Sequence, residues 1–150
     1  MPPEKRTPSV VSIGYEGRTA DDLISDLRRQ DVQVLVDVRL TPLSRKPGLS
    51  KTKLAAALAA AGIGYVHARS LGNPKDNRDA YRAGDQSSRQ RFEEILESSA
   101  ADDALSHVAE LLDGGSVALL CFERDHSTCH RHQVAEALAG RAPGLRVVHV

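Results

Sequence analysis

The chain has 150 residues, with 20 basic and 20 acidic side chains and no formal net charge. This length favours one domain and is enough to bury a core without disulfide or metal staples. The charge balance argues against a basic surface of the kind that binds nucleic acid non-specifically. The sequence contains no run of about 18 apolar residues, so no membrane span is predicted.

Residues 1–8 are polar and lack the apolar core of a signal peptide, so we expect a short disordered lead before a single domain at 9–150. The two cysteines are too few for the disulfide framework of a small secreted protein. We therefore expect a cytoplasmic protein.

Short apolar runs rich in β-branched residues predict five strands, and helical spacing of apolar residues predicts helices between them. The strands are expected at 10–13, 32–38, 63–67, 117–122 and 145–150. Helices are expected after Thr19, at 50–61, 89–97 and 101–112, and around 134–138 with Ser127 or Thr128 as the cap. Residues 71–85 are polar, contain Gly, Pro and Asn, and predict a long loop.

The alternation of strands and helices predicts a single three-layer α/β domain, with a mostly parallel sheet and helices on both faces. In such sheets, ligands bind outside the carboxyl ends of the strands at a topological switch point. The residues that follow each predicted strand are therefore the candidates for a functional site.

Gly14, Tyr15 and Gly17 follow the first predicted strand. The glycines permit a tight turn, and the helix start behind them could bind an anion through free N–H groups. The alternative is an ordinary strand-to-helix turn.

Asp37 lies at the end of the apolar second strand, and Arg39, Ser44 and Arg45 follow it. A buried carboxylate needs a partner, and Arg39 is the natural candidate, because residues two apart in a strand share a face. Guanidinium groups here suit a carboxylate or phosphate ligand. A purely structural Asp–Arg pair that orders the loop is the alternative.

The densest set of reactive groups follows the fourth strand and includes Cys121, Glu123, Cys129, His130 and Arg131. We expect Cys129 in the first turn of the last helix, where the helix N-terminus and nearby cations favour the thiolate. Arg131 shares a helical face with apolar residues, so it should point towards the sheet.

Four interpretations of this segment remain open. It could be a thiol or acid–base site for an anionic substrate, a redox disulfide, or a polar helix start beside a buried structural cysteine. It could also bind zinc or iron, but the spacing matches no standard zinc finger, so we assign no metal ligand. The metal ligands in that case would come from Cys121, Glu123, His126, Cys129 and His130.

These residues together resemble the domain-of-unknown-function 488 family, over about residues 9–150. The most specific part of the pattern is Cys121-x-Glu123 followed by Cys129-His130-Arg131. The resemblance implies an α/β fold and a shared polar edge, but no established activity or cofactor. The other matching segments are Ile13–Tyr15, Val36–Arg39 with Pro42, Ser44 and Arg45, Gly62–Tyr65, Leu71–Gly72 and Val147–Val150.

The leading hypothesis is a small enzyme that acts on an anionic, phosphate- or nucleotide-like ligand. Asp37, Cys121, Glu123 and Cys129 would form its reactive groups. One alternative is a module that binds nucleic acid or protein through the basic residues between Lys75 and Arg91, although mixed charge there favours a solvated loop. A metal-binding protein is the other. Ligand contacts are expected from Gly14, Tyr15, Arg39, Ser44, Arg45, His130 and Arg131.

Overall fold

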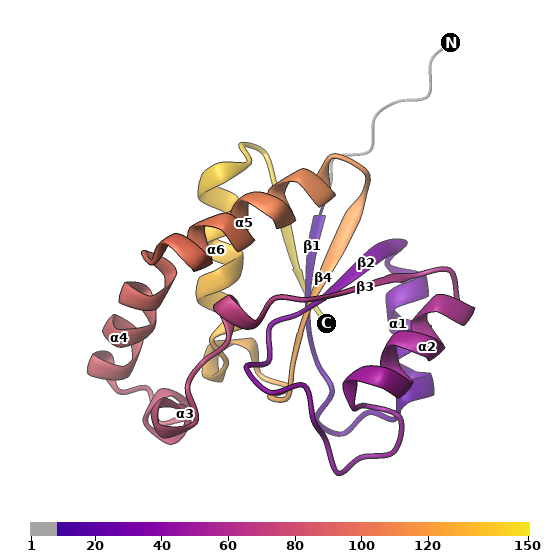
Figure 1. Ribbon diagram of the computed structural model, residues 1–150, viewed down its shortest axis with the longest axis horizontal. Coiled ribbons are helices and arrows are strands. Elements are labelled where there is room, and N and C mark those ends of the chain that lie inside the picture. Colours follow the sequence, from indigo (N-terminus) through magenta and orange to yellow (C-terminus); the bar gives the residue numbers. More distant parts are fainter. Residues whose placement is uncertain (1–8) are drawn as a thin grey trace.

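The computed structural model describes residues 9–150, and its five strands form one parallel sheet in the order β3-β2-β4-β1-β5 (Figure 1). Each predicted strand is confirmed, with its ends within one residue of the expected positions. The disordered lead expected for residues 1–8 lies outside the described residues. The strands are β1 Ser9–Gly14, β2 Val32–Asp37, β3 Gly64–His67, β4 Ser116–Cys121 and β5 Arg146–His149.

Helices cover both faces of the sheet, as the predicted three-layer α/β architecture requires (Figure 1). One face carries α1 (Ala20–Arg29) and α2 (Lys51–Ala60). The other is covered by α5 (Ser99–Leu112) and α6 (Arg131–Arg141), with α3 (Lys75–Arg82) and α4 (Gln86–Leu96) beyond them on the same side. Two short 3₁₀ turns, η1 (Arg69–Leu71) and η2 (His126–Thr128), complete the fold. Within residues 9–150, every helix is too short or too polar to cross a membrane.

Alternate residues of the central strands enter two separate cores. On β4, Val117, Leu119 and Cys121 pack with α5 and α6, whereas Ala118 and Leu120 pack with α1 and α2. This alternation follows from the two-residue period of a strand and explains why β4 is apolar along its length. It also directs the side chain of Cys121 towards α6.

The start of α1 agrees with its predicted cap. Thr19 accepts a hydrogen bond from the Asp22 backbone N–H, and the Asp22 carboxylate accepts one from the Thr19 backbone N–H. These two bonds form a capping box and satisfy donors that the first helical turn leaves without partners.

The long loop predicted for residues 71–85 is wrong over Lys75–Arg82, which forms α3. This helix buries only Asn77 and Tyr81, so its apolar pattern is too sparse to identify it. One buried ring and tertiary hydrogen bonds hold it: Tyr81 packs against Phe92 and donates to Gln133 Oε1 over 2.5 Å, and Asn77 donates to Ser88 O over 3.0 Å. Tertiary hydrogen bonds thus outweigh the weak local signal.

The predicted cap of the last helix is also wrong. Asp125 caps η2 by accepting from the Ser127 backbone N–H, and α6 begins only at Arg131. Cys129 therefore precedes the helix by two residues and does not lie in its first turn. The extra turn arises because the Asp125 carboxylate competes for the backbone donors of this segment.

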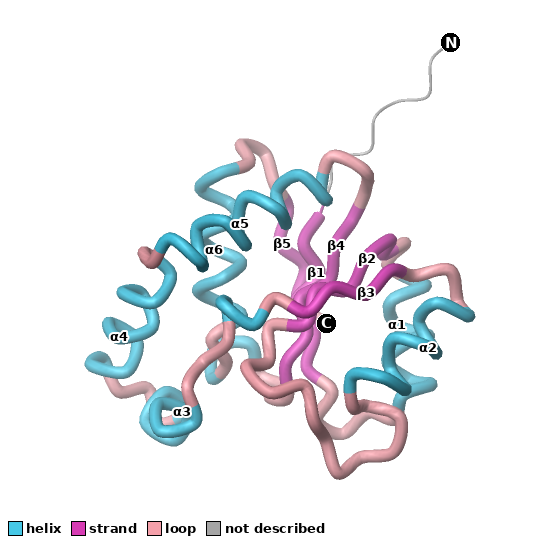
Figure 2. The backbone as a smooth tube through the Cα atoms, in the orientation of Figure 1, coloured by secondary structure: helices cyan, strands magenta, loops and turns pink. Residues whose placement is uncertain are grey.

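The strand order creates a switch point between β2 and β4. The chain leaves β2 through α2 towards β3, and it leaves β4 through α6 over the opposite face towards β5 (Figure 2). Connections that diverge from neighbouring strands leave a crevice at their carboxyl ends, which is where open α/β sheets bind ligands. The chain segments that begin at Val38 and Phe122 form the walls of this crevice.

Candidate functional site

A cavity of about 190 Å³ lies at this crevice; we refer to it as the switch-point cavity. It brings together the segments after β1, β2 and β4 with α3 and the residue before α6, so the predicted convergence of the strand ends is observed. Its lining is Tyr15, Arg39, Leu40, Thr41, Leu43, Asn73, Arg78, Arg82, Cys121, Phe122, Glu123 and His130.

Asp37 and Arg39 form a buried ion pair beside the cavity. The Asp37 carboxylate is fully buried and accepts from Arg39 Nε at 2.8 Å, from Arg39 Nη2 at 2.7 Å and from the Tyr65 hydroxyl at 2.6 Å. Burial opposes the charge of Arg39, but the hydrogen bonds and charge of Asp37 outweigh it and raise the pKa of the guanidinium. The remaining terminal nitrogen of Arg39 donates to Leu49 O, so this pair also anchors the loop after β2.

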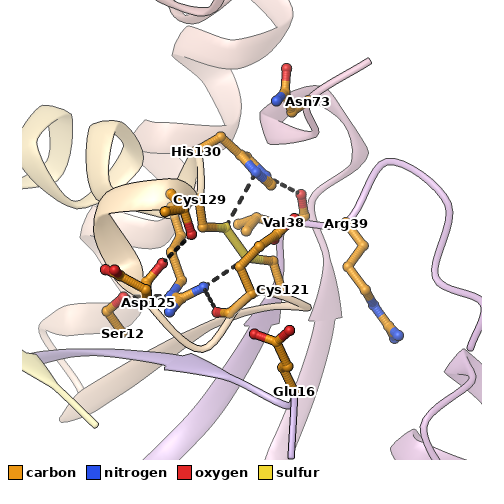
Figure 3. The surroundings of a disulfide bond; sticks show 12 residues. Ser12, Glu16, Val38, Arg39, Asn73, Cys121, Asp125, Cys129 and His130 are labelled. Atoms are coloured by element: carbon orange, nitrogen blue, oxygen red, sulfur yellow. Dashed lines mark hydrogen bonds between the residues drawn. A yellow bond between two sulfur atoms is a disulfide. The ribbon is translucent and has the colours of Figure 1, made fainter. Parts of the chain in front are cut away.

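Cys121 and Cys129 are joined by a disulfide, and both are buried (Figure 3). Among the four interpretations of this segment, the structure therefore contains the disulfide. The sulfur of Cys121 accepts a hydrogen bond from Arg131 Nη1 at 2.9 Å and lies 3.6 Å from Glu123 Oε2. A cation and a carboxylate therefore flank the sulfur at the end of β4.

Arg131 is completely buried, and its guanidinium bonds entirely to the protein. Nε donates to Ser12 Oγ at 2.7 Å, Nη1 donates to Glu123 O at 2.5 Å as well as to the sulfur, and Nη2 donates to Arg124 O at 3.1 Å. Burial lowers the pKa of Arg131 to about 10, so it stays charged near pH 7. It points to the sheet, as predicted, and holds the loop after β4; direct contact with a ligand stays a prediction.

His130 lies between the disulfide and β2 (Figure 3). Its Nε2 is 2.8 Å from Val38 O, and its Nδ1 is 3.6 Å from Cys129 Sγ. Burial lowers the pKa of His130 to about 4, so the ring is neutral near pH 7. A neutral ring that donates through Nε2 to the carbonyl has its unprotonated Nδ1 directed at the sulfur.

Two arginines of α3 line the cavity and were missed as site residues. Arg82 Nε bonds Glu123 Oε1 at 3.0 Å, and Arg78 Nε donates to Asn73 O at 3.2 Å. This segment was expected to be a solvated loop, so the sequence did not indicate where in the fold its positive charges would lie. Their spacing of four residues, which places both on one helical face, is the signal that could have identified them.

The predicted ligand contacts after β1 and β2 divide between two places. Tyr15 lines the switch-point cavity, and Gly14 lies directly beneath the backbone of Glu123. Ser44 and Arg45 instead line a separate hollow of about 380 Å³ beside the start of α2. The structure therefore does not join these two residues to the cysteines, and their contact with a ligand stays a prediction.

A larger hollow of about 800 Å³ lies between β3 and α5 and shares Leu40 with the switch-point cavity. Its wall is mainly apolar and contains neither cysteine nor Glu123. The smaller cavity is the candidate site because the switch point, Cys121 and three arginines meet there.

A family model described as Domain of unknown function DUF488 matches residues 19–138, about four-fifths of the chain. The chain belongs to this family. The matched range contains both cysteines, Glu123, His130 and Arg131, whereas Gly14 and Tyr15 precede it. No curated protein and no solved structure matches the chain. Family membership thus identifies a shared domain but brings no activity.

Proposed function

We propose that this protein is a small enzyme that acts on an anionic, phosphate- or nucleotide-like ligand in the switch-point cavity. One observation carries the proposal: three guanidinium groups meet a cysteine sulfur and a carboxylate in one cavity at the carboxyl edge of the sheet. Arginines bind phosphate and carboxylate groups in a bidentate manner, and the sulfur and carboxylate supply reactive groups.

Arg78 and Arg82 are the cations best able to reach an incoming anion. The two terminal nitrogens of Arg78 bond no partner within residues 9–150, and the Arg82 side chain is 46% exposed. The cavity is smaller than the roughly 300–1,000 Å³ that hold a whole drug-sized ligand, so it suits an anionic head group. Phe122 and Leu43 are exposed large apolar side chains in its lining and could support an apolar part such as a base.

In the reduced protein, Cys121 and Glu123 would be the reactive groups. The charge of Arg131, 2.9 Å from the sulfur, favours a thiolate at Cys121. The Glu123 side chain is 14% exposed and can accept or return a proton at the cavity. Cys129 would serve as the second thiol, and Asp37 would orient Arg39.

The test is a thermal-melting screen of the reduced chain with inorganic phosphate, nucleoside monophosphates and thiosulfate. An anion at 100 times its dissociation constant should stabilise the fold by about 2.7 kcal/mol. Arg78→Gln removes one charged donor from the cavity and should weaken binding about tenfold or more.

Arg29→Gln is the matched control, because Arg29 is 74% exposed at the carboxyl end of α1 and does not line the cavity. It removes the same charge and should leave the shift unchanged. An absence of any shift across the anion panel, or equal loss in Arg78→Gln and Arg29→Gln, would refute the proposed function.

A further inference from the structure

Three potential metal ligands meet beneath the switch-point cavity. One ligand atom each from Cys121, Cys129 and His130 lies within 4.8 Å of the other two, and all three residues are buried. In the oxidised chain the two sulfurs bond each other. We propose that, once this disulfide is reduced, Cys121, Cys129 and His130 bind one zinc ion whose fourth coordination position opens into the switch-point cavity.

The orientation of His130 matches that of a metal ligand. Metal-bound histidines usually donate their second ring N–H to a backbone carbonyl or carboxylate, which fixes the ring and its tautomer. Here Nε2 faces Val38 O at 2.8 Å, and Nδ1 faces the sulfur of Cys129 at 3.6 Å. The ring is therefore already held with its lone pair on the side of the two sulfurs.

The surrounding groups also suit two thiolates on a divalent ion. Two thiolates and a neutral imidazole cancel the charge of Zn²⁺, so the buried centre carries no net charge. Arg131 Nη1, 2.9 Å from Cys121 Sγ, would remain an outer-shell donor to the bound sulfur. Two cysteines and one histidine with an open fourth position form a ligand set known for catalytic zinc.

The fourth coordination position of the zinc ion would face the cavity beside Glu123. The Glu123 carboxylate lies 3.6 Å from Cys121 Sγ but is not part of the group of three. Cys121, His130 and Glu123 all line the cavity, whereas Cys129 does not. A water molecule or ligand that enters the cavity would therefore reach the ion beside Glu123.

Formation of the site requires a balanced two-electron reduction. Two equivalents of a small thiol reduce the disulfide to two cysteine thiols and are themselves joined as a disulfide. Zinc then displaces one proton from each cysteine thiol, so binding releases two protons. The oxidised chain has no thiolates to offer and should not form this site.

Titration of the full-length reduced chain with Co²⁺, under anaerobic conditions, tests the proposal without a variant. We expect one Co²⁺ per chain, with the visible absorption of tetrahedral cobalt and a thiolate-to-cobalt charge-transfer band that zinc abolishes. Cys129→Ser should weaken binding by more than roughly 100-fold, the upper range for loss of an outer-shell partner. The oxidised chain should give no such band.

His132→Gln is the control, because His132 pairs with Glu136 and lies near His126 and His149, outside the group of three ligands. It should bind cobalt as the wild type does. Absence of the charge-transfer band, equal binding by the oxidised chain, or equal loss in His132→Gln and Cys129→Ser would overturn the proposal.

The metal site and the proposed function can fail separately. An anion-induced melting shift that depends on Arg78, in reduced chain that binds no cobalt, would reject only the metal site. Cobalt binding through the cysteines without any anion shift would reject only the anion-binding enzyme.

Discussion

The Asp37 side chain connects β2, the loop after it and β3 near the switch-point cavity. It lies at the end of β2, pairs with Arg39 in the following loop and accepts from Tyr65 on β3. A buried ion pair gains little over apolar packing, but removal of one partner leaves the other charge uncompensated. The main role of the Asp37 carboxylate is therefore to neutralise the buried charge of Arg39, since the pair itself adds little net free energy.

We predict that Asp37→Asn lowers the free energy of unfolding by about 3–5 kcal/mol, because Arg39 keeps its charge while 6% exposed. Urea unfolding followed by circular dichroism measures this loss. Asp79→Asn is the control: its side chain is 98% exposed and pairs with Arg82, so the change should stay within about 0.5 kcal/mol. Similar effects of the two substitutions would contradict the structural role of the buried pair.

Gly14 is required by a close approach of two backbones. A Cβ atom at this position would lie 1.8 Å from Glu123 O and 2.5 Å from Glu123 C. Backbone atoms cannot rotate out of the way as the end of a side chain can. Gly14→Ala should therefore displace the loop after β4 and destabilise the fold by about 1–3 kcal/mol or more.

Gly140→Ala is the control, and in chemical denaturation we expect it to stabilise the fold. Nothing lies within 4 Å of an added Cβ at Gly140, which is exposed near the end of α6. Alanine should stabilise the helix there by roughly 0.5–1 kcal/mol. If Gly14→Ala were as well tolerated as Gly140→Ala in chemical denaturation, the close backbone approach would be wrong.

The side chains that meet at the cavity were only partly predictable. Asp37, Arg39, Cys121 and Glu123 could be placed together, because parallel strands end at one edge. The partners of Arg131 could not, since Ser12 Oγ is 119 residues away and no local pattern links the two. Each nitrogen of the Arg131 guanidinium donates to the protein, and its contact with a ligand stays a prediction.

Among the elements, those with a regular apolar pattern were predictable and those held by polar contacts were not. β2 and β4 are nearly continuous apolar runs that are mostly buried, a pattern that identifies strands covered on both faces. α3 has charged or polar residues at most positions and depends on hydrogen bonds to Gln133 and Ser88. Such contacts come from segments distant in sequence, so local periodicity could not reveal them.

The capping box of α1 gives a prediction at the scale of one helix. Thr19→Ala should lower the free energy of unfolding by about 1 kcal/mol at pH 7, because the Asp22 N–H loses its acceptor. Thr52→Ala, at an exposed position inside α2, should be neutral or slightly stabilising, since alanine is the better helix former. Guanidinium-chloride unfolding of both variants distinguishes a cap from a general effect of losing threonine.

The same box has a defined pH dependence. Backbone and side-chain hydrogen bonds with Thr19 lower the pKa of Asp22 below its ordinary value of 3.8. A carboxyl whose pKa is lower in the folded state contributes fully above pH 3.8 and loses its contribution as pH falls through the folded value. Thr19→Ala removes the side-chain contribution and keeps the backbone N–H, so it should weaken this pH dependence only in part; an unchanged acid profile would exclude a contribution from the Thr19 side chain.

For the whole molecule, the disulfide closes a short loop between the end of β4 and the start of α6, with a sequence separation of eight. Chain-entropy arguments give such a loop about 2.5 kcal/mol of stabilisation. Treatment of the oxidised chain with a dithiol in the presence of a chelator should therefore lower its unfolding free energy by about that amount.

A variant with both Cys121→Ala and Cys129→Ala is the control for this measurement, since it has no disulfide to lose. Its urea unfolding curve should be the same with and without the dithiol. A dithiol effect of equal size in this variant would show that the reductant acts elsewhere, and the disulfide would then contribute nothing measurable.

The position of β4 in the sheet has a consequence for synthesis of the chain. β1 and β2 do not pair with each other; β4 lies between them and bonds both. A nascent chain that has not yet emerged past residue 116 therefore holds β1 and the β2–β3 pair without the strand that joins them. The central part of the sheet cannot form until β4 has been synthesised, and until then the two facing strand edges are open to chaperones or to unwanted pairing.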